Sequence, residues 1–252
     1  MPAGLIVALD KIWDHYDDNI ESFLWDLRDV AGFKVTAAGF LNGLTDLLFP
    51  FMSAMGRSKS SPYQYDLLVD FKIADVGVEK NGNWVGTNFE IVEAIVQNAP
   101  VTHLTVHGFP GEMSVQECVA ASEKYGVQCL LLSSMTHAGS KQFMPFPGYM
   151  NDMIELAKKS NVAGFIAPGN DHAFLTDLTM QIGNKFSIWS PGFGRQVTLR
   201  GGEKVGIGEQ IRSWMHIVEP HRDHLDNRII VGSYIVNDDE DPGARVKELN
   251  KI

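Results

Sequence analysis

Short apolar runs, rich in β-branched and aliphatic residues, recur along the whole chain. Most of them lack the polar alternation of a half-buried strand, so we expect both faces of each strand to be covered, as in a parallel sheet. The predicted strands cover residues 5–10, 32–38, 66–73, 103–108, 128–134, 162–169, 186–192 and 228–234.

Amphipathic patterns of helical period lie between several of these strands. The clearest of them cover residues 88–99, 114–126 and 151–160. Asn88, Ser114 and Asn151 are suitable N-caps for these helices. Strands that alternate with helices over 252 residues predict an α/β fold, a (β/α)8 or TIM barrel. A doubly wound open sheet is the alternative.

No linker or low-complexity segment divides the chain, which predicts one (β/α)8 barrel domain over residues 1–252. The Gly, Asn and Lys residues near 77–86 indicate an exposed loop insertion. The long stretch near 193–210, which contains several glycines, is interpreted as a lid. A chain of this length can bury a sizeable core without disulfides or metals.

Charged residues interrupt one of the apolar runs, "LLVDFKIADVG" at residues 67–77. Asp70 and Lys72 are two positions apart, so on a strand their side chains share a face. Lys34 ends the preceding predicted strand, and Asp75 begins the loop after this one. Buried charges of this density are costly unless they pair. We therefore predict an alternating array of two lysines and two aspartates at the carboxyl ends of the strands, where barrel enzymes place their active residues.

Such an array is preorganised to stabilise charge that develops during a reaction. A second interpretation is a Mg²⁺ site that uses Asp70 and Asp75, with Lys72 as acid or base. The pattern alone leaves both interpretations open.

The overall charge and the cysteines narrow the class of partner. A formal net charge of -10 argues against general affinity for nucleic acid or an acidic membrane surface. Cys118 and Cys129 lack paired spacing, which indicates two buried thiols in a reducing compartment. The first apolar run, residues 5–9, lacks a basic flank and is not interpreted as a signal peptide. We expect a cytoplasmic protein without a membrane span.

Several segments together resemble the orotidine 5′-monophosphate decarboxylase suprafamily. The suprafamily signature D-x-K-x-x-D at the end of the third barrel strand is matched by Asp70, Lys72 and Asp75. Five further segments resemble members that act on orotidylate, above all the archaeal ones: "LIVALD" (5–10), "FKV" (33–35), "THLTVHGFPG" (102–111), "LLLSSMTHAG" (130–139) and "SPGFGRQ" (190–196).

The resemblance implies the conversion of orotidine 5′-monophosphate to uridine 5′-monophosphate and CO2, without metal or cofactor. In that family pattern Lys72 is the proton donor, and Asp70 and Lys34 belong to its electrostatic frame. Asp75 and Thr87 would come from the second subunit of a homodimer. The other residues that the pattern places at the substrate are Asp10, Thr136, Pro191, Gly192, Gln196, Gly232 and Ser233.

The chain departs from the family pattern at the phosphate. The family reads V-G-R after its last barrel strand, where this chain ends the same segment with Ser233. One hydroxyl replaces a forked guanidinium, which is the stronger phosphate ligand. Our hypothesis is that Arg200 or Arg195 in the lid supplies the missing charge, and the alternative is that both arginines are solvated.

Two further functions stay open. "IADVG" (73–77) also resembles relatives that act on a sugar phosphate through a Mg²⁺-stabilised enediolate, of the keto-gulonate phosphate decarboxylase or hexulose phosphate synthase type. The missing arginine raises the third possibility, a descendant that binds nucleotides without turnover.

Overall fold

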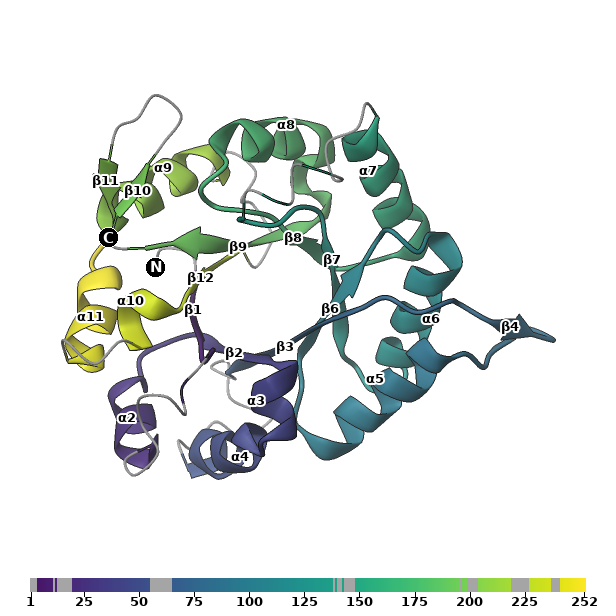
Figure 1. Cartoon of the computed structure of the whole chain (residues 1–252), viewed down its shortest axis with the longest axis horizontal. Coiled ribbons are helices and arrows are strands. Elements are labelled where there is room, and N and C mark those ends of the chain that lie inside the picture. The colour runs from purple at the N-terminus through teal and green to yellow at the C-terminus, as the bar shows by residue number, and fades with distance from the viewer. Residues whose placement is uncertain are drawn as a thin grey trace.

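The computed structural model describes residues 4–10, 12, 20–54, 65–137, 139, 142, 148–194, 196–198, 204–218, 227–236 and 241–252. Parallel strands close into a barrel in the order β1-β12-β9-β8-β7-β6-β3-β2, shown in Figure 1. Their bounds are β1 Gly4–Ala8, β2 Gly32–Thr36, β3 Asp66–Ile73, β6 His103–His107, β7 Gln128–Leu132, β8 Gly164–Ile166, β9 Ser187–Phe193 and β12 Arg228–Val231.

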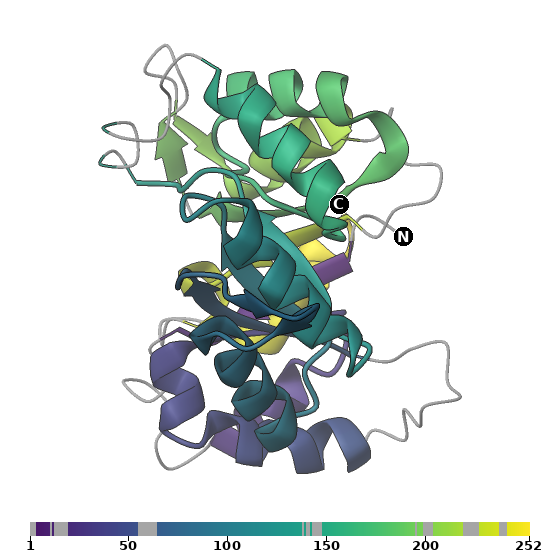
Figure 2. The same cartoon turned by 90° about the vertical axis from the view of Figure 1, so that its right-hand side faces the viewer.

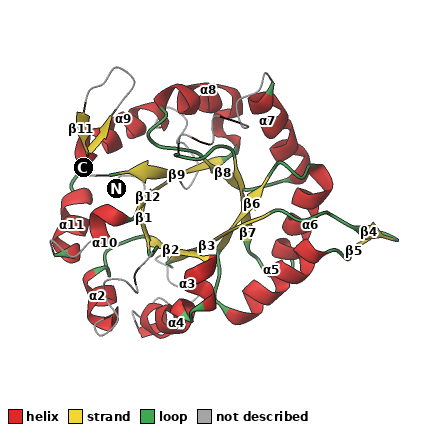
Figure 3. Cartoon of the chain, in the orientation of Figure 1, coloured by secondary structure: helices red, strands yellow, loops and turns green. Residues whose placement is uncertain are grey.

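Helices surround the barrel on its outside, as Figures 1 and 3 show. Figure 2 shows the barrel from the side, with α7 and α8 on one side of the strands and α4 on the opposite side. No helix within the described ranges is long and apolar enough to cross a bilayer. The helices are α2 Ile20–Asp26, α3 Ala37–Leu41, α4 Leu44–Ala54, α5 Thr87–Asn98, α6 Glu112–Glu123, α7 Tyr149–Ser160, α8 His172–Ile182, the 3-10 helix η2 Gly183–Lys185, α9 Ile207–Val218, α10 Ser233–Val236 and α11 Pro242–Leu249.

The predicted α/β barrel is confirmed, and the closed sheet rules out the doubly wound alternative. The predicted N-caps are wrong, because α5, α6 and α7 each begin before them, after Gly86, Gly111 and Gly148. Both cysteines are free and buried, as predicted.

Strand residues alternate between two apolar cores. Leu5 and Val7 of β1 pack toward the helices, in a core that also contains Phe33 and Val35 of β2. The second core fills the inside of the barrel with Ile6, Ala8, Leu68, Leu130, Leu132, Ile166, Trp189 and Ile230. Since side chains alternate along a strand, Lys34 and Asp70 take the inward face. The alternation therefore directs these charged side chains into the barrel, next to the apolar core that fills its inside.

Two antiparallel hairpins are added to the barrel. β4 (Glu79–Lys80) and β5 (Asn83–Trp84) pair within the segment predicted as an insertion, and this hairpin projects outward from the barrel in Figure 1. β10 (Gln196–Thr198) and β11 (Lys204–Gly206) pair within the segment predicted as a lid. Closure of that segment over a ligand stays a prediction.

Candidate active site

Charged side chains of alternating sign line one side of the barrel mouth. The Lys34 Nζ atom lies 2.8 Å from Asp10 Oδ1 and 3.3 Å from Asp70 Oδ2. The Lys72 Nζ atom lies 2.8 Å from the same Asp70 Oδ2 atom. The order along the array is thus Asp10, Lys34, Asp70 and Lys72, which places each ammonium against at least one carboxylate.

The two lysines of the array differ in exposure. The side chains of Lys34 and Asp70 are 9% and 13% exposed, whereas that of Lys72 is 37% exposed. The Lys72 ammonium is therefore the cation of this array that a ligand in the mouth can reach. The Lys34 ammonium is buried and donates to two carboxylates, those of Asp10 and Asp70.

The environment of Asp70 keeps its carboxylate ionised. Burial raises the pKa of this carboxyl group, while the charges of Lys34 and Lys72 and hydrogen bonds from Lys72 and Thr105 lower it. The lowering effects prevail, and the pKa of Asp70 lies below its ordinary value. The negative charge of Asp70 holds the two ammonium groups around it.

An irregularity in β3 aims the Lys72 side chain. Lys72 has φ 53, in the left-handed region, and the pairing of β3 with β6 shifts between Val69 and Ile73. A non-glycine residue in this region is strained and needs support from its surroundings. The Thr105 hydroxyl supplies it: Oγ1 accepts the Lys72 backbone N–H at 2.9 Å and donates to Asp70 Oδ1 at 2.9 Å.

Thr105 was missed in the sequence. In "HLTVHG" (103–108), Thr105 is two positions from both His103 and His107, so the three side chains share one face of β6. This spacing could have pointed to an inward-facing hydroxyl.

The array lines a cavity of about 300 Å³ at the carboxyl ends of the strands. Leu132, Ile166 and Ile230 of the inner core supply apolar lining, so the cavity combines a charged side with an apolar wall. That combination suits a flat, partly apolar ligand that carries a polar or charged group. The predicted site residues that line the cavity are Asp10, Lys34, Asp70, Lys72, Thr136, Pro191, Gly192, Gly232 and Ser233.

Gly192 lets the chain approach closely at one edge of the cavity. Its φ is 105, and a Cβ atom there would lie 2.9 Å from Thr136 Cγ2 and 3.0 Å from Asn170 Oδ1. Only glycine fits both the backbone conformation and the space.

Some predicted residues lie elsewhere. Asp75 and Thr87 are exposed and do not line the cavity; Asp75 Oδ1 accepts the Val76 N–H at 2.7 Å. Across the described ranges, no ion pair joins Asp75 to Lys72 of the same chain. Gln196 belongs to β10, but its side chain lies outside the described part, as do Arg195 and Arg200.

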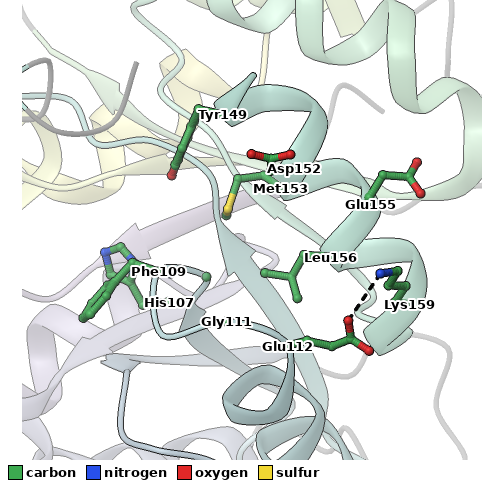
Figure 4. Close-up of a pocket in the computed structure, with 11 residues that line it drawn as sticks. His107, Phe109, Gly111, Glu112, Tyr149, Asp152, Met153, Glu155, Leu156 and Lys159 are labelled. Atoms are coloured by element: carbon green, nitrogen blue, oxygen red, sulfur yellow. Dashed lines mark hydrogen bonds and ion pairs between the residues drawn. The ribbon is translucent and has the colours of Figure 1, made fainter. Parts of the chain in front are cut away.

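A second, larger cavity of about 620 Å³ lies between α7 and the loop after β6. Figure 4 shows the side chains that line it. Its centre is lined by apolar side chains such as Met153 and Leu156, and the ion pair between Lys159 and Glu112, at 3.4 Å, closes one end. His107 also lines it, and burial together with the charge of Lys72 lowers the pKa of that imidazole. Because the alternating charges lie in the smaller cavity, we assign the candidate site there.

Relatives found by sequence carry one name. The chain is 27% identical over 183 residues to the orotidine 5′-phosphate decarboxylase of Methanococcoides burtonii, an alignment that covers 73% of this chain and 71% of the relative. It is 29% identical over 151 residues to that of Methanosarcina barkeri, covering 58% of this chain and 63% of the relative.

Solved structures share the fold over nearly the whole chain. Orotidine 5′-monophosphate decarboxylase from Methanocaldococcus jannaschii, complexed with the inhibitor BMP, superimposes with a TM-score of 0.75 at 23% identity, covering 100% of this chain and 98% of that one. The enzyme from Pyrococcus horikoshii gives a TM-score of 0.68 at 20% identity, covering 98% and 100%. The model of the orotidine 5′-phosphate decarboxylase / HUMPS family matches residues 4–249, and the chain belongs to this family.

Proposed function

We propose that this chain decarboxylates orotidine 5′-monophosphate to uridine 5′-monophosphate and CO2, a step of pyrimidine nucleotide synthesis in the cytoplasm. The family and the name of the relatives described above support this reaction. The observation that carries the proposal is the Lys72 ammonium, held 2.8 Å from an ionised Asp70 at the mouth of a cavity with apolar walls.

The chemistry needs a cation at one ring atom. Breaking the bond to CO2 leaves an electron pair on C6 of the pyrimidine, and no cofactor is required if a fixed ammonium stabilises that charge. Lys72 then donates its proton to C6 and completes the product. Because Asp70 and Thr105 hold Lys72 before the reaction, little reorganisation is needed as charge develops.

The remaining cavity residues are assigned to the substrate. Asp10, which is fixed by Lys34 at 2.8 Å, is proposed to bind the ribose. Thr136 is proposed to hydrogen-bond to the pyrimidine ring, and Pro191 is proposed to pack against that ring. The phosphate is assigned to the edge of the cavity at Gly192, Gly232 and Ser233. Gln196 and Arg200 or Arg195, whose side chains lie outside the described part, are proposed as its further ligands.

The same array argues against the alternative with Mg²⁺. Both ammonium groups lie within 3.3 Å of Asp70 Oδ2, so a divalent cation at that oxygen would meet two positive charges. A site for a divalent cation needs carboxylate or carbonyl oxygens free of competing cations.

Assays of the purified protein distinguish these three functions. We expect the absorbance of orotidylate to fall with time, and the rate to be the same with and without EDTA, because the array needs no metal. A rate that EDTA abolishes and Mg²⁺ restores, with turnover of a keto sugar phosphate in place of orotidylate, would contradict the proposal. Binding of uridylate without turnover would indicate the nucleotide-binding descendant.

We further propose a homodimer in which Asp75 and Thr87 act in the partner's site. Apolar side chains are exposed after three neighbouring strands: Leu41 after β2 at 79%, Val76 after β3 at 70%, and Phe109 after β6 at 71%. An apolar face of this kind beside a site supports an interface with a second copy. Such a face, next to the mouth, would bring Asp75 to the partner's Lys72.

Mixed dimers test this shared site. We expect Lys72→Ala and Asp75→Asn homodimers to be nearly inactive, because each lacks one charged group of every shared site. Random mixing of the two chains gives about half mixed dimers, each with one intact site, so about a quarter of wild-type activity should return. The measurement is orotidylate turnover after joint refolding, and activity that stays at the level of the separate variants would contradict a shared site.

A further inference from the structure

A buried polar cluster closes the base of the inserted segment. Asn88 of α5 and Glu117 of α6 are both 0% exposed, and Ser114 is 1% exposed. Polar groups that are buried this completely need hydrogen-bond partners. Their partners include the backbone at both ends of the segment that carries the β4–β5 hairpin.

Asn88 holds Asp75 by the backbone. Its Oδ1 atom accepts the Asp75 N–H at 2.9 Å, and its Nδ2 atom donates to the Asp75 carbonyl oxygen at 2.9 Å. A single amide side chain therefore satisfies both backbone groups of Asp75. The position of Asp75 is fixed relative to the start of α5 although its carboxylate is exposed.

Glu117 holds Asn88 and the other end of the segment. One carboxyl oxygen accepts the Gly86 N–H, and the second accepts from Asn88 Nδ2 at 3.1 Å. A Cβ atom on Gly86 would lie 2.7 Å from both carboxyl oxygens, so only glycine leaves room for this contact. Glu117 thereby joins the two ends of the insertion to α6.

We propose that Glu117 is a positioning residue for the decarboxylation. It does not touch the substrate; it acts through Asn88 on Asp75, and by way of Asp75 on the partner's Lys72. The inference rests on the proposed shared site, because Asp75 matters only if it reaches a neighbouring array.

Glu117→Gln tests this role because it replaces one carboxylate oxygen by an NH2 group and keeps the volume of the side chain. The amide oxygen can still accept the Gly86 N–H, but the new NH2 group then faces the Asn88 NH2 group. If Asn88 turns over to relieve this, its NH2 group faces the Asp75 N–H instead. One link between Glu117 and Asp75 is lost in either case.

The mixed dimers show on which chain Glu117 acts. In a dimer of one Lys72→Ala chain and one Asp75→Asn chain, the intact site takes its Asp75 from the Lys72→Ala chain. Glu117→Gln on that chain should lower the restored kcat about 10-fold, since a misplacement of catalytic groups by about 1 Å can cost up to about 10²-fold and the loss of one hydrogen bond is expected to move Asp75 by less. The same substitution on the Asp75→Asn chain should leave the restored activity unchanged, because position 75 of that chain has already lost its carboxylate.

Each outcome decides between the possibilities. Equal loss on both chains would mean that Glu117 only stabilises the barrel, and no loss on either chain would mean that it positions nothing; both overturn the proposal. Absence of restored activity with Glu117 intact would overturn the shared site and the inference with it. Gly86→Ala, which crowds the same oxygens, should show the same asymmetry.

Glu123→Gln on the exposed face of α6 serves as the matched control and should have no effect on either chain. The melting temperature of each homodimer shows that the variants fold.

Discussion

Replacement of Lys72 by alanine is expected to lower kcat for orotidylate about 10⁴-fold or more, the combined scale of losing a proton donor and an electrostatic stabiliser. Lys72 is the most exposed cation of the array, and its ammonium lies 2.8 Å from Asp70. Without it the negative charge on the ring carbon has no nearby cation and no proton. The measurement is the steady-state loss of orotidylate absorbance, with KM determined separately.

Two further variants show what Lys72 supplies. Lys72→Arg keeps a positive charge, but a guanidinium does not give up its proton under physiological conditions, so we expect most of the loss to remain. Lys124→Ala removes a lysine that pairs with Glu93 on the exterior at 2.6 Å and should leave kcat unchanged. If the Lys72→Ala variant kept a tenth of the wild-type kcat, another group would have to be the proton donor.

The barrel was predictable because its strands are buried on both faces. Continuous apolar runs mark such strands without any long-range information, and each run predicted from the sequence overlaps a barrel strand. The helix starts were not predictable from capping residues. Asn88 has the chemistry of an N-cap, but tertiary contacts with Asp75 and Glu117 use its amide instead.

The strand alternation also predicted part of the site. It placed Asp70 beside Lys72 and Lys34 on the inward face, and the structure brings these three groups into contact. The left-handed backbone of Lys72 leaves no trace in the residue types around it. Thr105 and Glu117 contact partners 29 to 35 positions away in sequence, and such pairs cannot be identified from one sequence without the fold.

The second large effect is expected for Asp70→Asn, which should lower kcat about 10²- to 10³-fold, the scale of removing one preorganised electrostatic group. If the amide oxygen keeps the Thr105 hydrogen bond, the NH2 group takes the place of Oδ2 and faces both ammonium groups, so the volume is kept while the charge and the contacts with the lysines are lost. Lys34 and Lys72 then flank a neutral group in place of the anion that both now contact. Asp66→Asn, on the same strand but paired with Arg228 at 2.9 Å, is the control and should keep its kcat.

The dependence of stability on pH gives an independent check on Asp70. Its pKa in the folded chain lies below 3.8, the ordinary value. An aspartate whose pKa is lowered by folding contributes stability that is fully present above its ordinary pKa and is lost as the pH falls through the folded value. The free energy of unfolding of the wild type should therefore fall more steeply below pH 3.8 than that of Asp70→Asn. Denaturant unfolding at a series of pH values measures both curves, and parallel curves would mean that the two lysines do not stabilise the charge of Asp70.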